Sequence, residues 1–329
     1  MAKSKTKYNV TAEEIRQLFT KHKIGNIITI QPLGAGEFNA VFKVETEHKT
    51  YVLKIAPPKN TFVLTYEKNM MRSEVFWYEK MHEYTSINAP NIYISDFSNE
   101  IISSDCFIME MMEGQPLWMF KFTREEHDRI QAKKIEMLTQ IHKIHNDKYG
   151  YLQTGLHDTW YDAIHNMVSN LITDCNNLGR ETPDGCKLLQ YIEKNQELLS
   201  KVPCSMVNFD LWDSNILYNN RNLTWIDPER SFWGDPIADF ITIGKGQKTP
   251  LSEKLSEIEI YNRTAEVPIS ANSEECIRYA IAVGYLALVE EVEKYVRYEP
   301  DEENFIRNTV DARDMYDMTF KVLEEKIYE

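Results

Sequence analysis

Short, mostly apolar runs typical of β-strands follow one another along the first hundred residues, and the helical period appears there at two places. A helix is expected after Thr11, where Glu14 completes a capping box, and a second helix is expected over 67–84. The strands expected in this part lie at 27–30, 40–44, 51–55, 91–95 and 106–112. The front part of the chain is therefore rich in strands.

The later part of the chain is dominated by the helical period. A strand-like section at 205–226 interrupts helices that are expected at 123–146, 159–178, 184–200, 236–245, 251–263, 272–297 and 301–327. The segment Glu113-Gly114-Gln115-Pro116 separates the two parts. We therefore expect a two-lobed α+β protein, with an N-lobe at 1–112, a hinge at 113–116 and a C-lobe at 117–329.

Charge narrows the classes of partner. The 329 residues include 37 Lys and Arg against 51 Asp and Glu, a net charge of −14. Nucleic acids and anionic membranes are bound by positively charged faces, so neither is an expected partner. The charge is uneven, with 10 basic and 5 acidic residues in 1–60 but 9 basic and 19 acidic residues in 251–329. The basic N-terminal segment suits the binding of a polyphosphate, and the acidic C-terminal segment suits a cationic partner. Charged side chains that are merely exposed to solvent would explain the same pattern.

The cysteines and the apolar runs indicate the cellular compartment in which the protein is expected. Five cysteines are scattered along the chain, and no two of them are spaced C-x-x-C. No apolar h-region follows Met1, and no apolar run approaches the ~20 residues of a membrane-spanning helix. We expect free thiols in a reducing cytoplasm.

Candidate phosphate-binding residues lie in the strand-rich part. Gly34 and Gly36 fall between two expected strands, where they would let backbone N–H groups approach a polyphosphate, although a glycine-rich hairpin turn explains them equally well. The P-loop sequence G-x-x-x-x-G-K-[ST] is absent. Lys54 is either a solvated residue of an edge strand or a cation that points into a cleft. With Glu74 of the helix at 67–84 it could form the ion pair that holds a lysine on ATP phosphates.

The segment richest in candidate chemistry reads V-N-F-D-L-W-D-S-N over 207–215 and is followed by I-D-P-E-R over 226–230. Asp210 and Asn215 lie in a loop before an expected strand, and Asp227 ends the next strand. Phosphoryl transfer needs a carboxylate that orients and deprotonates a hydroxyl, and it needs oxygen ligands for Mg²⁺. The alternative is a turn rich in Asp and Asn that binds nothing.

In this order the motifs resemble the aminoglycoside phosphotransferase and choline kinase-like superfamily, relatives of the protein kinases, from about Leu33 to Phe240. The resemblance implies a protein-kinase-like fold that uses Mg²⁺ and either ATP or GTP. It also implies that Asp210 is the catalytic base and that Asn215 and Asp227 bind Mg²⁺. The residues that it implies for nucleotide binding are Gly34, Gly36 and Asn39 in the phosphate loop, the Lys54–Glu74 pair, and the backbone of Glu110 and Met112 at the hinge.

The chain departs from the family pattern at two positions. Asn208 stands two residues before the base, where the family has His as scaffolding, and an Asn can still donate and accept hydrogen bonds. Pro228 follows Asp227 where protein kinases have Phe-Gly, which favours a small-molecule kinase. Asp235 is expected to cap a helix, and Asp239 is expected to brace the catalytic loop.

Together these inferences predict transfer of the γ-phosphate of ATP or GTP to a hydroxyl of a small molecule, in a pocket built by 117–200 and 250–329. Aminoglycosides, other amino sugars, choline-like amines, homoserine-like compounds and sugar alcohols all stay open, with a slight preference for a cationic acceptor. Fructosamine kinases are a weaker resemblance. A catalytically silent nucleotide-binding protein is an alternative that only Asn208 supports. A protein kinase is disfavoured because no Ala-Pro-Glu follows Asp227. The oligomeric state is left open.

Overall fold

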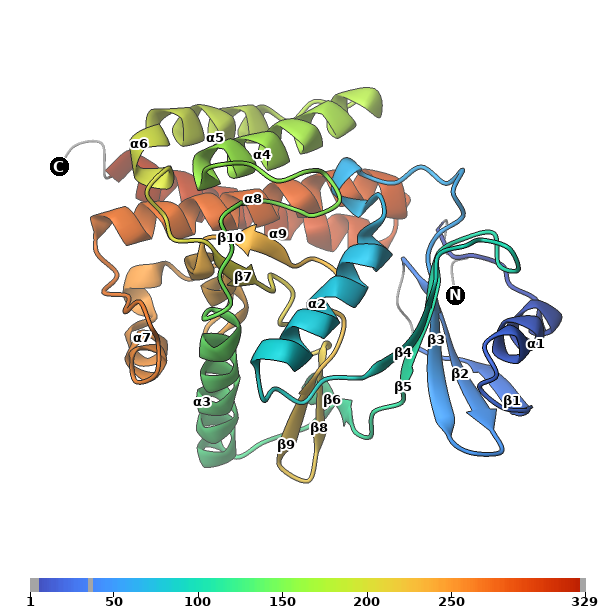
Figure 1. Cartoon of the computed structure of the whole chain (residues 1–329). Coiled ribbons are helices and arrows are strands. Elements are labelled where there is room, and N and C mark those ends of the chain that lie inside the picture. Colours follow the sequence, from blue (N-terminus) through green and yellow to red (C-terminus); the bar gives the residue numbers. More distant parts are fainter. Residues whose placement is uncertain (1–5, 35–37, 326–329) are drawn as a thin grey trace.

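An antiparallel sheet and a helical region make up the two parts of the molecule (Figure 1). The computed structural model describes residues 6–34 and 38–325. Strands come first along the chain and long helices follow, with short strands inserted between them. The predicted α+β architecture is confirmed.

The N-terminal sheet has five antiparallel strands in the order β1-β2-β3-β5-β4. Its strands are β1 (Ile27–Pro32), β2 (Ala40–Thr46), β3 (Thr50–Ile55), β4 (Ile92–Asp96) and β5 (Cys106–Glu110). Helix α1 (Ala12–Lys21) begins at the predicted capping box and covers one face of this sheet. Its buried residues Ile15, Leu18 and Phe19 pack in one apolar cluster with Leu53 of β3 and Ile108 of β5.

The position of β3 decides how Lys54 is presented. Successive side chains of a strand point to opposite faces of the sheet. Leu53 and Ile55 belong to the cluster beneath α1, so Lys54 points to the other face, toward helix α2 (Met70–Tyr84). Because β3 pairs with β2 on one side and β5 on the other, Lys54 is not a solvated residue of an edge strand.

The helical region is arranged around one buried helix. Its helices are α3 (Arg124–Ile141), α4 (Trp160–Asn177), α5 (Pro183–Lys194), α6 (Gln196–Leu199), α7 (Leu255–Asn262), α8 (Ser273–Arg297) and α9 (Glu303–Glu325). Every residue from Tyr279 to Val289 of α8 is buried, as expected for a helix enclosed on all sides. Figure 1 shows α9 alongside α8, with α4 and α5 covering another side of it.

Short elements connect the long helices and carry the loops of interest. The strands are β6 (Gln115–Pro116), β7 (Ser205–Val207), β8 (Ile216–Asn219), β9 (Asn222–Trp225) and β10 (Phe232–Gly234). The 3₁₀ helices are η1 (Thr65–Glu67), η2 (Leu117–Met119), η3 (Pro236–Thr242) and η4 (Leu251–Glu253). Strands β6, β8 and β9 form one small antiparallel sheet, while β7 pairs with β10.

The helix predicted at 123–146 ends earlier than its apolar pattern indicates. It stops at Ile141, and the carbonyl of Ile144 accepts a hydrogen bond from the backbone N–H of Met206 at 2.8 Å. His145 also forms an isolated β-bridge with Ser205 of β7. Pairing with a strand about sixty residues away therefore replaces the last turn of the predicted helix.

Three further elements differ from prediction. The helix predicted at 184–200 is interrupted at Asn195, whose side chain donates to the carbonyl of Tyr191 at 2.8 Å and so competes with the helical pattern. The helix predicted at 236–245 is the 3₁₀ helix η3, which ends before Gly244 at a φ of +64°. The strand predicted at 106–112 ends two residues earlier, at Glu110.

Both ends of α2 are attached to the helical region. Before α2, Thr65 donates its N–H and its hydroxyl to the carboxylate of Asp174 in α4, at 2.7 and 2.8 Å. Glu67 accepts a hydrogen bond from Arg297 of α8 at 2.6 Å. After α2, the carbonyl of Asn88 accepts from a backbone N–H of β9 at 2.9 Å. Helix α2 is thus fixed to the C-terminal part although the chain places it between two strands of the sheet.

Candidate active site

Two loops meet at the edge of the helical region. One loop joins β7 to β8 (208–215) and the other joins β9 to β10 (226–231), and the N–H of Ile226 donates to the carbonyl of Asn215 at 3.0 Å. Phe209 and Asp227 have φ angles of +60° and +63°. A left-handed backbone costs a non-glycine residue about 1–2 kcal/mol, so it persists only where the surroundings fix it. Backbone strain is therefore concentrated beside Asp210 and at Asp227 itself.

Asp210 is half-buried and held by its own loop. Asn215 donates its side-chain N–H groups to the Asp210 carboxylate and carbonyl, each at 3.0 Å. The N–H of Asp210 donates to the side-chain oxygen of Asn208 at 3.2 Å. Burial raises the pKa of Asp210 to about 7, opposed by the nearby Arg230 and reinforced by Asp227 and other carboxylates. The group is thus poised to exchange a proton near neutral pH.

Asp239 of η3 braces this loop from below. Its fully buried carboxylate accepts the backbone N–H groups of Asn208 at 2.9 Å and Phe209 at 2.6 Å. His142, at the end of α3, lies 3.1 Å from the same carboxylate through Nε2, and its Nδ1 lies 2.9 Å from the hydroxyl of Tyr261. The Asn208 side chain meanwhile supports Asp210. The contacts of Asn208 therefore hold the loop in place, as expected for a residue with a scaffolding role.

Lys54 lies at the centre of a cluster of carboxylates. Its ammonium donates to Glu74 of α2 at 2.8 Å, to Glu229 at 3.1 Å and to Asp227. Burial disfavours the charged ammonium, but Asp227, Glu229 and Glu74 outweigh that penalty and raise the pKa of Lys54 well above its usual value. The structure thus brings together Lys54, Glu74 and Asp227, which are separated by as many as 173 positions in the chain.

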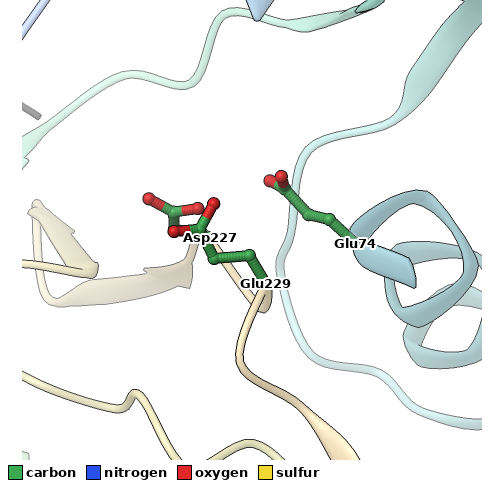
Figure 2. A group of neighbouring side chains, drawn as sticks. All are labelled: Glu74, Asp227 and Glu229. Carbon is green, nitrogen blue, oxygen red and sulfur yellow. The ribbon is translucent and has the colours of Figure 1, made fainter. Parts of the chain in front are cut away.

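Glu229 joins this cluster, and the sequence reasoning gave it no role. One carboxylate oxygen each from Glu74, Asp227 and Glu229 lie within 4.8 Å of one another. Figure 2 shows Glu74 reaching from α2 toward Asp227 and Glu229, which come from the loop opposite. The position of Glu229 two residues after Asp227 was the signal that the sequence offered.

Arg230 and Glu293 form a second charged group beside Asp210 that the sequence did not reveal. Arg230 donates to Glu293 of α8 at 2.7 Å, and Arg297 lies 3.2 Å from the other oxygen of that carboxylate. The hydroxyl of Tyr66 also donates to Glu293. Arg230 therefore supplies positive charge that opposes the rise in the pKa of Asp210, whereas the Glu293 carboxylate contributes to that rise.

Comparison with known families identifies this arrangement. The sequence model of the phosphotransferase enzyme family matches residues 29–257, more than half of the chain. The chain belongs to the phosphotransferase enzyme family. The matched residues include Lys54, Asp210 and Asp227, and the region ends inside α7.

Solved structures share the fold of this phosphotransferase. A candidate fructosamine-3-kinase of Haemophilus somnus 129PT is 17% identical with a TM-score of 0.67, and the match covers 93% of this chain and 97% of that one. A candidate aminoglycoside phosphotransferase of Ralstonia eutropha JMP134 is 16% identical with a TM-score of 0.68, over 96% of this chain and 99% of that one. The streptomycin–ATP complex of APH(2")-IIa is 19% identical with a TM-score of 0.59, over 93% and 97%.

These likenesses show that the phosphotransferase has the protein-kinase-like fold of its family. No curated protein matches the sequence of the chain. Within residues 6–34 and 38–325, no helix combines the length and the apolar character that crossing a bilayer requires.

The nucleotide-binding residues predicted for the phosphotransferase fall into two places. Gly34 has a φ of +74°, and Asn39 donates its side-chain N–H to Glu229 at 2.8 Å, so Asn39 of the predicted phosphate loop reaches the carboxylate cluster. Gly36 lies outside the described residues. Glu110 and Met112 lie apart from this cluster, at and beyond the end of β5. The N–H of Glu110 donates to the carbonyl of Asn91 at 2.9 Å, so this N–H is already engaged within the fold.

Proposed function

We propose that this phosphotransferase moves the γ-phosphate of ATP or GTP onto a hydroxyl group of a small molecule, with Asp210 as the base. The observation that carries the proposal is the convergence of Lys54, Glu74 and Asp227 next to the braced loop of Asp210. The ATP in the complex of APH(2")-IIa and the GDP in that of aminoglycoside 2'-phosphotransferase-IIIa support a nucleoside triphosphate as donor.

In the proposed reaction the acceptor hydroxyl donates a hydrogen bond to Asp210 and gives up its proton to that carboxylate. The acceptor oxygen forms a bond to the γ-phosphorus while the bond between this phosphorus and the β–γ bridging oxygen breaks. ADP or GDP then leaves. Lys54 contacts the nucleotide phosphates while Glu74 holds its ammonium. Most of the rate acceleration comes from positioning and from charge neutralisation.

Asn215 and Asp227 are proposed to hold Mg²⁺. The residues fit this ion because amide and carboxylate oxygens are the ligands that Mg²⁺ takes in proteins. A carboxylate oxygen of Glu74 is moreover buried without a hydrogen-bond partner among the described residues. Mg²⁺, when bound, supplies positive charge that stabilises the transferring phosphoryl group.

The acceptor is proposed to carry an amine. The hydrogen-bond partners of the glutamates in the acidic C-terminal region limit which of them could bind that amine. Glu293 is occupied by Tyr66 and two arginines. Glu291 accepts hydrogen bonds from Thr182 at 2.7 Å and Tyr316 at 3.0 Å. In Glu290, by contrast, one carboxylate oxygen is buried without a hydrogen-bond partner among the described residues.

Glu290 lies one helical turn from Glu293, on the side of α8 that approaches Arg230. Burial, and after it the charge of the neighbouring Asp311, raise the pKa of Glu290 to about 7. A bound ammonium group would relieve this unfavourable environment. The streptomycin and gentamicin complexes of APH(2")-IIa are consistent with an amine-bearing acceptor in this family.

A panel assay tests the proposal. The purified full chain is incubated with Mg²⁺ and ATP or GTP and with aminoglycosides, ketosamines, choline-like amines and neutral sugars, and nucleoside diphosphate release is measured. We expect release above the acceptor-free rate for at least one amine, and its loss in Asp210→Asn. Nucleotide binding without hydrolysis or transfer would instead support the catalytically silent alternative. A ketosamine as the preferred acceptor would favour the fructosamine kinase-like alternative.

A further inference from the structure

Three carboxylates from two parts of the fold surround a single ammonium group. Glu74 comes from α2, whereas Asp227 and Glu229 come from the loop between β9 and β10 (Figure 2). All three accept hydrogen bonds from the Lys54 ammonium. With every group ionised, the cluster keeps a net charge of −2, and a divalent cation would balance that charge.

Burial makes this excess negative charge unfavourable. The Glu74 side chain is fully buried, and the Glu229 side chain is 14% exposed. Charges withdrawn from water are stable only when they are paired, and one ammonium does not pair three carboxylates.

Two buried oxygen atoms at the cluster independently favour the binding of a cation. The side-chain oxygen of Asn39 is buried and lacks a hydrogen-bond partner among the described residues, although the amide nitrogen of the same group lies 2.8 Å from Glu229. The second oxygen of Glu74 is also buried without a partner in the described part of the chain. Asn39 is 6% exposed and Glu74 is not exposed at all. Unpartnered buried oxygens are rare in folded proteins and suit a hard cation.

We propose that Glu229 is a further carboxylate ligand of the divalent cation beside Asp227, and that Lys54 occupies their site until the cation binds. This inference rests on the proposed function, because it assigns a residue to the cation of that reaction. Asp227 is 36% exposed and Glu229 14%, so the cation approaches from their side of the cluster. Glu74, which is fully enclosed, stays with Lys54.

The proposal makes Lys54 an exchangeable partner. One ammonium cannot hold Asp227 and Glu229 and also contact nucleotide phosphates in full. Binding of the cation releases Lys54 from these two carboxylates and leaves it on Glu74, where it can turn to the phosphates. The cation and the nucleotide therefore favour the same rearrangement, so each should increase the affinity for the other.

Mn²⁺ binding to the full chain without nucleotide tests the proposal, with the EPR signal of free Mn²⁺ as the readout. We expect Glu229→Gln to weaken Mn²⁺ binding about tenfold or more, as removal of groups at a metal site commonly does. We expect Lys54→Met to tighten it about tenfold, because a competing positive charge is gone. Glu79→Gln makes the same charge change at an exposed position of α2 and should leave Mn²⁺ affinity unchanged.

Affinities of the wild type and Glu229→Gln within twofold of each other would overturn the role of Glu229. Unchanged or weaker binding by Lys54→Met would overturn the exchange. Circular dichroism checks that each variant is folded, and Glu229→Asp, which withdraws the carboxylate by one methylene, replaces Glu229→Gln if that variant unfolds. Mn²⁺ binding that depends on Glu229 in a protein that phosphorylates no acceptor would keep this inference and remove the proposed function. Acceptor phosphorylation by a protein whose Mn²⁺ binding does not depend on Glu229 would keep the proposed function and remove this inference.

Discussion

Replacement of Asp239 by Asn should destabilise the protein more than the loss of one ordinary hydrogen bond. The Asp239 carboxylate accepts two backbone N–H groups of the loop that carries Asp210. An Asn side chain has one oxygen, so one of these N–H groups would face an NH₂ group instead of an acceptor. The isosteric change leaves the packing volume almost constant, and the expected effect therefore comes from hydrogen bonding and charge.

The magnitude follows from the two contacts. A hydrogen bond to a charged acceptor contributes about 1.5–3 kcal/mol, and a buried donor without a partner costs about 1–3 kcal/mol. Since one bond is lost and the other loses its charge, Asp239→Asn should lower the free energy of unfolding by about 3–5 kcal/mol. That is a large part of the roughly 5–15 kcal/mol that stabilises an ordinary folded protein.

Urea unfolding followed by tryptophan fluorescence measures this change. Asp128→Asn, at an exposed position of α3, is the matched control and should leave stability within about 0.5 kcal/mol. At temperatures where Asp239→Asn stays folded, its turnover should fall because the Asp210 loop has lost its support. A destabilisation below about 1 kcal/mol would refute the bracing role.

Three other predictions address the reaction. Asp210→Asn should abolish transfer but leave nucleotide affinity, measured by calorimetry, within a few-fold, and near-normal turnover would contradict its role as base. Asn208→Ala removes the oxygen that accepts the N–H of Asp210 and should lower stability by about 1–3 kcal/mol together with the rate. Asn208→His should keep most of both, and loss of turnover at an unchanged melting temperature would instead indicate a chemical role. Once an amine acceptor is found, its kcat/KM should fall steeply up to ~0.3 M salt, where the screening length is below ~10 Å. A flat profile with a neutral acceptor would argue against Glu290 as part of the pocket.

The sequence predicted the elements whose signal is local. The apolar run around Lys54 indicated a strand, and the capping box at Thr11 marked the start of α1 where the structure has it. The loop of Asp210 was recognisable because its residue types and spacing are unusual. By contrast, the end of α3 depends on pairing with β7, which no pattern within 123–146 encodes.

The residues that the sequence missed act through distant partners. Glu229 accepts a hydrogen bond from Lys54, 175 positions earlier in the chain. Arg230 donates one to Glu293, 63 positions later. A glutamate or an arginine in a polar loop is ordinary when read alone. Only the folded chain shows that these two charged groups are buried and paired with oppositely charged side chains. Sequence periodicity and spacing therefore could not assign them a role.

The attachment of α2 at both of its ends determines which parts of the molecule can move together. Thr65 and Glu67 bond the segment before α2 to α4 and α8, and Asn88 bonds the segment after α2 to β9, so Glu74 is held with the C-terminal part. Lys54 belongs to the sheet. A rotation of the sheet away from the helices therefore strains the Lys54–Glu74 bond, together with the bonds that Arg72 of α2 donates to Asp105 before β5 at 2.6 and 3.2 Å. In hydrogen exchange, the amides of α2 should accordingly open with those of α8 rather than with those of β3, so the cooperative units of the protein do not follow its chain order.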